Sequence, residues 1–271
     1  MAKSKLSKIE KHYEAYGEGP TLIIIPGLYS STETSALNLL RPALEKHYKI
    51  IIGDNRGVGL SSKVNYDYST EDMAEDWNEL LENLGESSVH VLGSSMGSMI
   101  AQYLALNHPD KVRSLILADS APRATVYIKQ ILDVWMFLTK QVEYHEFLRL
   151  VNIMCFTHEH YEAYGDSILK AEAVAKDLLA QCPPFNHEAF CRLCRAVISH
   201  NAMERLSEIS APTLVISGDR DLLCPAVHAQ HMSEIIPNCK YICVKTCGHG
   251  IVFQKTEEFT RHVQSFLDDH S

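Results

Sequence analysis

Gly93-Ser94-Ser95-Met96-Gly97 is the stretch of this sequence that decides its fold, because it sets a serine between two glycines in a G-x-S-x-G pattern. The apolar residues 89–92 precede it and predict a short strand, and the helical spacing of apolar residues 99–104 follows it until Pro109. A strand, a tight glycine turn, a serine and a helix form a nucleophile elbow. Such a turn holds the serine at the amino end of a helix, where N–H groups and the helix dipole favour a developing anion.

The pentapeptide alone leaves its own meaning open. At ordinary glycine and serine frequencies a chain of this length contains about 0.1 accidental matches, so a plain strand-to-helix turn is the competing interpretation. Ser94 also neighbours Ser95, but Ser95 is the centre of the glycine-bracketed pattern. The rest of the chain therefore has to supply partners for the serine.

Length, composition and charge limit the class of protein. The 271 residues allow one large α/β domain or two small ones, and 46% apolar residues allow a sizeable core. The net charge of −9 argues against a nucleic-acid partner. No segment approaches the roughly 18 consecutive apolar residues of a membrane span, and residues 1–6 lack the apolar core of a signal peptide. We therefore expect a cytoplasmic protein with no membrane span.

The eight cysteines are expected to be free thiols in such a compartment. Cys191 and Cys194 have C-x-x-C spacing inside a helical pattern, with no second pair of that spacing. Cys239, Cys243 and Cys247 straddle a strand and a turn and do not converge as a structural zinc site requires. Neither a metal nor an organic cofactor is expected.

Apolar runs alternate with helical patterns along the chain, which favours a mainly parallel sheet with helices on both faces. Residues 8–15 alternate charged and apolar side chains, turn at residues 17–20 and return as residues 22–25, which predicts a hairpin at the edge of the sheet. Ser69 and Asp72 predict a capped helix start, with the helix ending at Gly85. Further strands are predicted at residues 48–52, 89–92, 115–118, 213–217 and 241–245.

The rhythm breaks between Pro122 and Arg205, where helical patterns occur without a strand candidate and Cys182-Pro183-Pro184 interrupts them. We interpret residues 122–205 as a helical lid inserted into a core of residues 1–121 and 206–271. Extra helices packed on the sheet edge for stability are the alternative. The lid is rich in aromatic side chains that could line an acyl pocket or pack among themselves: Trp135, Phe137, Tyr144, Phe147, Phe156, Tyr161 and Tyr164.

A serine hydroxyl is a poor nucleophile at neutral pH and needs a base, which a carboxylate orients. Two late strands are followed by suitable residues. Residues 218–225 bring Asp219 and Asp221 after one strand, and His249 stands between two glycines after the next. Asp119, after an earlier strand, is a third candidate for the acid.

At this point the chain resembles an α/β-hydrolase of the small serine-esterase type along essentially its whole length. The elbow carries the resemblance, together with the acid turn 218–225, the turn Gly248-His249 and the D-x-R-G-x-G-x-S run at residues 54–61. The resemblance implies the α/β-hydrolase fold, with an eight-stranded, mainly parallel sheet and a helical lid. The group it resembles most includes small esterases, enol-lactonases and pimeloyl-carrier-protein methyl esterases.

Residue by residue, the resemblance implies Ser95 as nucleophile, Asp221 as acid and His249 as base. It implies an oxyanion hole made by the backbone N–H groups of Met96 and Leu28. Family members usually carry histidine where this sequence has Pro26, so the geometry of that loop is an open question.

The expected function is cleavage of a carboxylic ester, lactone or thioester through an acyl-enzyme, with a small-molecule acyl ester as the partner. The same three residues also serve carbon–carbon bond hydrolases, perhydrolases and acyltransferases, and a ligand-binding receptor with little turnover belongs to a different class. The sequence does not reveal the oligomeric state.

Overall fold

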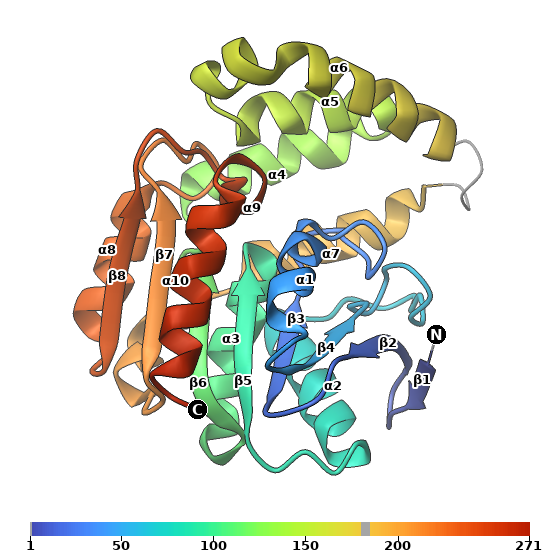
Figure 1. Ribbon diagram of the computed structural model, residues 1–271. Helices are drawn as coiled ribbons and strands as arrows, with labels where there is room; N and C mark the ends of the chain where they lie inside the picture. The colour runs from blue at the N-terminus through green and yellow to red at the C-terminus, as the bar shows by residue number, and fades with distance from the viewer. Residues whose placement is uncertain (1, 180–184) are drawn as a thin grey trace.

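The structure is a computed structural model that describes residues 2–179 and 185–271. Within these ranges, eight strands form one sheet in the order β1-β2-β4-β3-β5-β6-β7-β8 (Figure 1). The strands from β4 across to β8 run parallel, and β1 and β2 are antiparallel to their neighbours. The strands are β1 (Ala2–Lys5), β2 (Glu10–Tyr16), β3 (Thr21–Ile25), β4 (Lys49–Gly53), β5 (Val89–Ser94), β6 (Val112–Ala118), β7 (Thr213–Gly218) and β8 (Cys239–Val244).

The predicted edge hairpin is wrong. The two segments do form β2 and β3, but β4 lies between them, and β2 pairs antiparallel with β4 and with β1. The turn at residues 17–20 instead packs against the residues that lead into β4. Gly19 adopts φ 115° there, and a Cβ at this position would overlap the carbonyl of His47. Both edges of β3 are occupied by parallel neighbours, β4 and β5.

Alternate residues of each central strand enter opposite layers, because successive side chains of a strand point to opposite faces. In β3, Ile23 and Ile25 join one apolar core, which α2, α3 and α8 cover. Leu22 and Ile24 join the other, which α1 and α10 cover. The helices outside the 122–205 segment are α1 (Arg41–Leu44), α2 (Thr70–Asn83), α3 (Met96–Asn107), α8 (Ala226–Ile235), α9 (Ile251–Gln254) and α10 (Thr256–Asp268), with short 3-10 turns η1 (Ala36–Leu40) and η2 (Pro109–Lys111). A third 3-10 turn, η3 (Met203–Glu208), spans the end of that segment.

Helix α2 begins as the sequence predicted. Ser69 Oγ accepts a hydrogen bond from the N–H of Asp72 at 3.0 Å, and Asp72 Oδ2 accepts one from the N–H of Ser69 at 2.9 Å. Gly85 follows the helix at φ 71°. This reciprocal capping box satisfies two N–H groups that a helix start leaves unpaired.

Helices fill the sequence between β6 and β7, and they rise above the carboxyl ends of the strands (Figure 1). In the described part of the chain, no β-strand lies between β6 and β7. The two ends of the segment are tied together, since the N–H of Ala202 donates to the carbonyl of Pro122 at 2.8 Å. The helices are α4 (Val126–Leu138), α5 (Tyr144–Cys155), α6 (His158–Leu179) and α7 (His187–Ser199). The predicted interruption at residues 182–184 lies outside the described residues.

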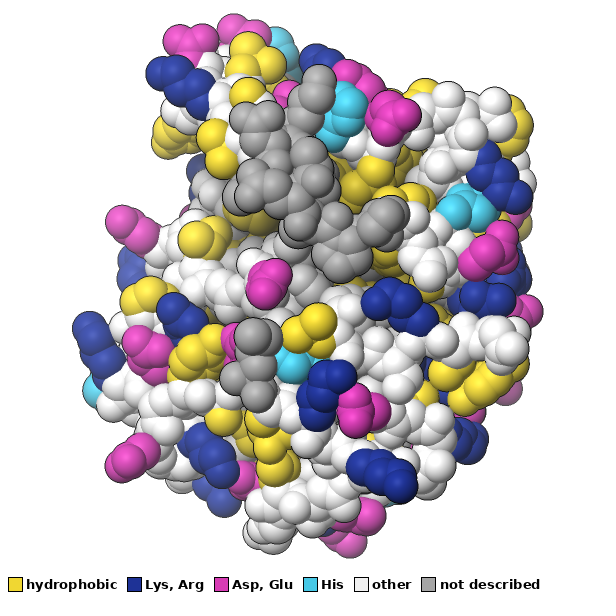
Figure 2. Space-filling view, turned by 90° about the vertical axis from the view of Figure 1, so that its right-hand side faces the viewer, with side chains coloured by type: hydrophobic (Ala, Val, Ile, Leu, Met, Phe, Trp, Pro, Cys, Tyr) yellow, Lys and Arg dark blue, Asp and Glu magenta, His cyan; other side chains and the backbone are white. Residues whose placement is uncertain are grey.

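The surface on the side of β1 and β2 carries acidic and basic side chains interspersed over its lower part (Figure 2). None of the helices that the structure describes is long and apolar enough to cross a bilayer. The cysteines in the described ranges are free thiols. Those ranges also contain no group of three or more His, Cys, Asp or Glu side chains suited to a metal ion.

Candidate active site

The turn at Ser95 is built by its two glycines. Ser95 follows β5 and precedes α3, with φ 55° and ψ −120°. A Cβ on Gly93 would overlap the carbonyl of Gly97, and a Cβ on Gly97 would overlap the carbonyl of Ile25 at the end of β3. Serine at positive φ is strained, and such strain persists only where surrounding structure enforces it. The pattern that opened the sequence analysis is therefore a steric requirement of this turn.

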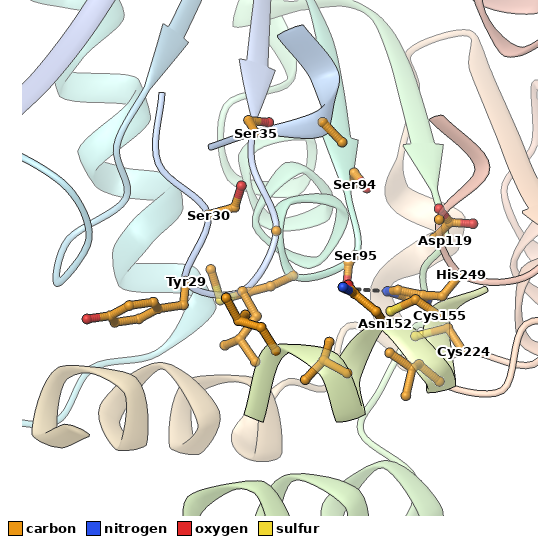
Figure 3. Close-up of a pocket in the computed structure, with 18 of the residues that line it drawn as sticks. Tyr29, Ser30, Ser35, Ser94, Ser95, Asp119, Asn152, Cys155, Cys224 and His249 are labelled. Carbon is orange, nitrogen blue, oxygen red and sulfur yellow. Dashed lines mark hydrogen bonds between the residues drawn. The ribbon is translucent and has the colours of Figure 1, made fainter. Parts of the chain in front are cut away.

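The structure brings together the three side chains that the sequence singled out. Ser95 Oγ lies 2.9 Å from Nε2 of His249 (Figure 3). Nδ1 of His249 lies 2.8 Å from Oδ2 of Asp221. The other oxygen of Asp221 accepts from the N–H groups of Leu223 and Cys224 at 2.8 and 2.7 Å. These bonds fix the carboxylate, which in turn orients the imidazole. Hydrogen-bonded distances of this kind are those expected between a nucleophile, its base and the orienting acid.

The other acid candidates lie elsewhere. Asp219 Oδ1 accepts from the N–H of Cys247 at 3.2 Å and so braces the turn before His249. Asp119 is buried at φ 51° beside the cavity, and among the described residues its Oδ1 has no hydrogen-bond partner. Neither carboxyl makes the bond to His249 that Asp221 makes.

The charges around His249 set its protonation. Burial alone lowers the pKa of His249, but the charge and hydrogen bond of Asp221, with the charge of Asp119, outweigh it and raise the pKa to about 9. Burial raises the pKa of Asp119 well above its usual range, against the lowering effect of His249. Asp221, which supplies both a charge and a hydrogen bond, is the chief cause of the raised imidazole pKa.

Leu28 and Met96, the two residues expected to supply oxyanion donors, lie beside the same space as Ser95. Leu28 and Met96 both line the cavity, and neither backbone N–H donates to a backbone acceptor within residues 2–179 and 185–271. Met96 is the first residue of α3, where helix geometry leaves the N–H without an internal partner. Both N–H groups are thus available to an oxygen bound next to Ser95.

The loop that carries Leu28 is held by side chains whose individual contacts the sequence did not predict. The side-chain amide of Asn55 donates to the carbonyl of Pro26 at 3.1 Å, and Asp54 Oδ1 accepts from the N–H of Thr32 at 2.6 Å. Both belong to the D-x-R-G-x-G-x-S run, predicted to be scaffold beside the site. These two hydrogen bonds hold the loop that contains Pro26.

The cavity around Ser95 has a volume of about 290 Å³. Its walls are mainly apolar and come from the β3 loop, α4, α5, α7 and the residues after His249. Among the described residues that line it, none is a lysine or arginine. The lining from the helical segment includes Ile128, Leu132, Trp135, Tyr144, Phe147, Val151, Phe156 and Phe190.

The aromatic side chains of the helical segment divide into two groups. Trp135, Tyr144, Phe147 and Phe156 line the cavity as the pocket interpretation expected. Phe137 and Tyr164 do not, since they are 63% and 56% exposed on the outer surface. Tyr161 is not in the lining either, and its hydroxyl is buried without a partner among the described residues.

Comparison with known proteins places this geometry in a family. A family model described as "alpha/beta hydrolase fold" matches residues 20–256. A protein named putative carbamate hydrolase RutD, from Stutzerimonas stutzeri strain A1501, is 25% identical over 255 residues, which cover 92% of this chain and 94% of the relative.

Solved structures agree with that match. MGS-M2, an alpha/beta hydrolase enzyme from a Medee basin deep-sea metagenome library, has a TM-score of 0.91 at 22% identity and covers 98% of this chain and 97% of its own. The enol-lactonase from Burkholderia xenovorans LB400 has a TM-score of 0.85 at 22% identity, covering 98% of this chain and 100% of its own. At that identity the likeness concerns the fold. This chain belongs to the alpha/beta hydrolase fold family.

Proposed function

We propose that this protein is a serine hydrolase that cleaves a carboxylic ester through an acyl-enzyme. The observation that carries the proposal is the unbroken hydrogen-bonded chain from Ser95 through His249 to Asp221, opening into an apolar cavity. His249 takes the proton of Ser95 Oγ as that oxygen attacks the ester carbonyl carbon. The N–H groups of Met96 and Leu28 stabilise the oxyanion.

The later steps use the same residues. The tetrahedral intermediate collapses, the bond to the alcohol oxygen breaks, and His249 gives its proton to the departing alcohol. Water then attacks the acyl-enzyme and passes a proton to His249. The imidazole returns that proton to Ser95 Oγ as the bond from Oγ to the acyl carbon breaks and the carboxylic acid leaves. Helices α4, α5 and α7 act as the lid in this proposal, because their side chains cover the cavity and shield these steps from bulk water.

The cavity supports an ester over a carbamate, the substrate class in the name of the S. stutzeri relative. A small polar carbamate would leave much of the apolar lining exposed to water, whereas an acyl chain would cover that apolar surface and exclude the water. Carbon–carbon cleavage, acyl transfer and peracid formation use the same nucleophile and remain alternatives to ester hydrolysis.

Hydrolysis of a short p-nitrophenyl ester tests the proposal, with Ser95→Ala and Ser94→Ala as a matched pair. Ser95→Ala should remove all but a few per cent of the activity, and Ser94→Ala should keep most of it. Labelling by a fluorophosphonate should follow the same pattern. A folded wild-type protein that ignores both the ester and the probe would instead indicate a ligand-binding receptor.

A further inference from the structure

A second hollow adjoins the cavity at Ser95. It is a groove of about 1180 Å³ lined by α5, α6 and the segment from α9 into α10. Four residues border both spaces: Leu148, Asn152, Phe156 and Phe253. We call these four residues the neck, the space at Ser95 the inner cavity, and the second hollow the outer groove. The two spaces are therefore neighbours that share these side chains, and a ligand that bound in both would pass between them.

Asn152 is a polar residue on the mostly apolar face of α5 that lines the inner cavity. Residues of α5 meet the inner cavity at helical spacing of three and four: Tyr144, Phe147, Leu148, Val151, Asn152 and Cys155. Asn152 is the one amide in that set. Packing against an apolar cavity favours an apolar residue at such a position, so the amide needs another reason to be there.

The side-chain amide of Asn152 has no hydrogen-bond partner among the described residues, although its main-chain carbonyl accepts from the N–H of Phe156 at 2.9 Å. In Figure 3 the amide points from α5 toward the pair formed by Ser95 and His249. An amide against apolar walls loses free energy unless water or a ligand pairs with it. Asn152 is half-buried, so water can reach its amide when the cavity is empty, and a polar group of a substrate beside Ser95 would take the place of that water.

The outer groove has a polar lining with charges of both signs. Arg149 lies 3.0 Å from Glu146 and 3.3 Å from Glu172, so these three side chains largely satisfy one another. The remaining charged or ionisable lining is His145, His160, Lys255, Glu257, Glu258 and Arg261. A lining with such mixed donors and acceptors suits a neutral ligand rich in hydroxyl groups better than a strongly charged one.

We infer that the inner cavity and the outer groove are the acyl and alcohol halves of one substrate site, and that the amide of Asn152 at the neck binds the alcohol half. The substrate class is an ester of an uncharged apolar acyl chain with a neutral polyhydroxy alcohol. This inference rests on the proposed ester hydrolysis. During cleavage the acyl–oxygen bond breaks, His249 protonates the alcohol oxygen, and Asn152 Nδ2–H donates to a hydroxyl of the departing alcohol.

The test compares two esters of the same acid, 1-octanoylglycerol and methyl octanoate, in the full-length protein. Wild type should have the higher kcat/KM for the glyceryl ester. Asn152→Leu keeps the size and removes the amide, so it should lower kcat/KM for the glyceryl ester at least tenfold and leave the methyl ester within threefold. Asn201→Leu, at an exposed asparagine outside both linings, is the matched control and should change neither.

The outcomes separate this inference from the function it rests on. If wild type cleaves both esters and Asn152→Leu lowers both equally, the alcohol site is wrong while the hydrolase remains. A marked preference for octanoylcholine or an anionic octanoyl ester would also overturn it, because the alcohol would then be charged. Wild type inert to all esters and to fluorophosphonate would overturn both proposals. Asn152→Asp, which keeps an acceptor and loses the donor, should repeat the selective loss if Asn152→Leu folds poorly.

Discussion

The side-chain amide of Asn55 donates a hydrogen bond to the main-chain carbonyl of Pro26, across 3.1 Å. The oxygen of the same amide accepts from Nε1 of Trp77 at 3.0 Å, which fixes the amide in one orientation. The Pro26 loop leads directly to Leu28, whose N–H is one of the two proposed oxyanion donors. Asn55 therefore acts on the reaction through the position of that N–H.

Asn55→Leu should lower kcat for a p-nitrophenyl ester at least tenfold while KM changes less than threefold. Losing an oxyanion donor outright costs about 10²–10³ in kcat, and a displaced loop loses part of that. Asn83→Leu, where the amide holds the β1 segment far from the site, should leave kcat unchanged. A rise in KM with kcat intact would show that Asn55 shapes the pocket and does not position the donor.

The raised pKa of His249 predicts an alkaline pH profile. The imidazole must be neutral to accept the proton of Ser95, and its pKa is about 9. We therefore expect kcat/KM to climb with pH and to reach half its plateau near that value. Asp221→Asn removes the charge that raises the pKa, so the rise should move to lower pH while kcat falls by about 10⁴. A wild-type midpoint near 6.5, the ordinary histidine value, would contradict this account of the charges.

Asp119 predicts a stability that falls as pH rises. Its pKa is raised on folding from an ordinary value of 3.8, chiefly by burial, so the native state holds a proton that the unfolded chain releases. The free energy of unfolding contributed by this group is fully present below 3.8 and is lost as the pH climbs through the raised value.

Asp119→Asn should therefore raise Tm at pH 8 and flatten the dependence of Tm on pH, because the amide is neutral throughout. Asparagine also tolerates the φ of 51° at this position. A gain of 1 kcal/mol corresponds to about 2–4 °C in a chain of this size. Thermal unfolding between pH 5 and 9 measures it, with exposed Asp110→Asn as the control. A variant whose Tm tracks wild type across that range would refute the assignment.

The elbow glycines predict a strong contrast between two equal substitutions. Gly97→Ala would push a methyl group into the carbonyl of Ile25, so we expect a loss of at least about 1–3 kcal/mol and of ester hydrolysis. Gly165→Ala in α6 meets no atom within 4 Å and should stabilise the protein by about 0.5–1 kcal/mol. Urea denaturation measures both free energies. Equal effects would mean that the close approach at Gly97 is unimportant.

Local sequence was sufficient for much of the fold. The elbow, the capped start of α2 at Ser69 and the strands at residues 89–92 and 213–217 were predictable because each depends on spacing within a few residues. The order of the strands in the sheet was harder to predict from the sequence. The hairpin prediction failed because alternation shows which face of β2 is buried but not which strand lies beside it.

The sequence by itself determined that a serine would stand in a tight turn between two glycines. The structure adds the reason, since Ser95 has a positive φ and a Cβ on either glycine would overlap neighbouring backbone. The sequence also indicated the late-strand histidine and the acid turn after β7. The resemblance implied Asp221 as the acid, and the tertiary structure shows that Asp221, and not Asp219 or Asp119, meets His249. Only the tertiary structure decided that Asn55 anchors Pro26 and that Asn152 stands at the neck. These relationships join residues tens of positions apart, and their distances depend on how the sheet and helices pack, which no local pattern encodes.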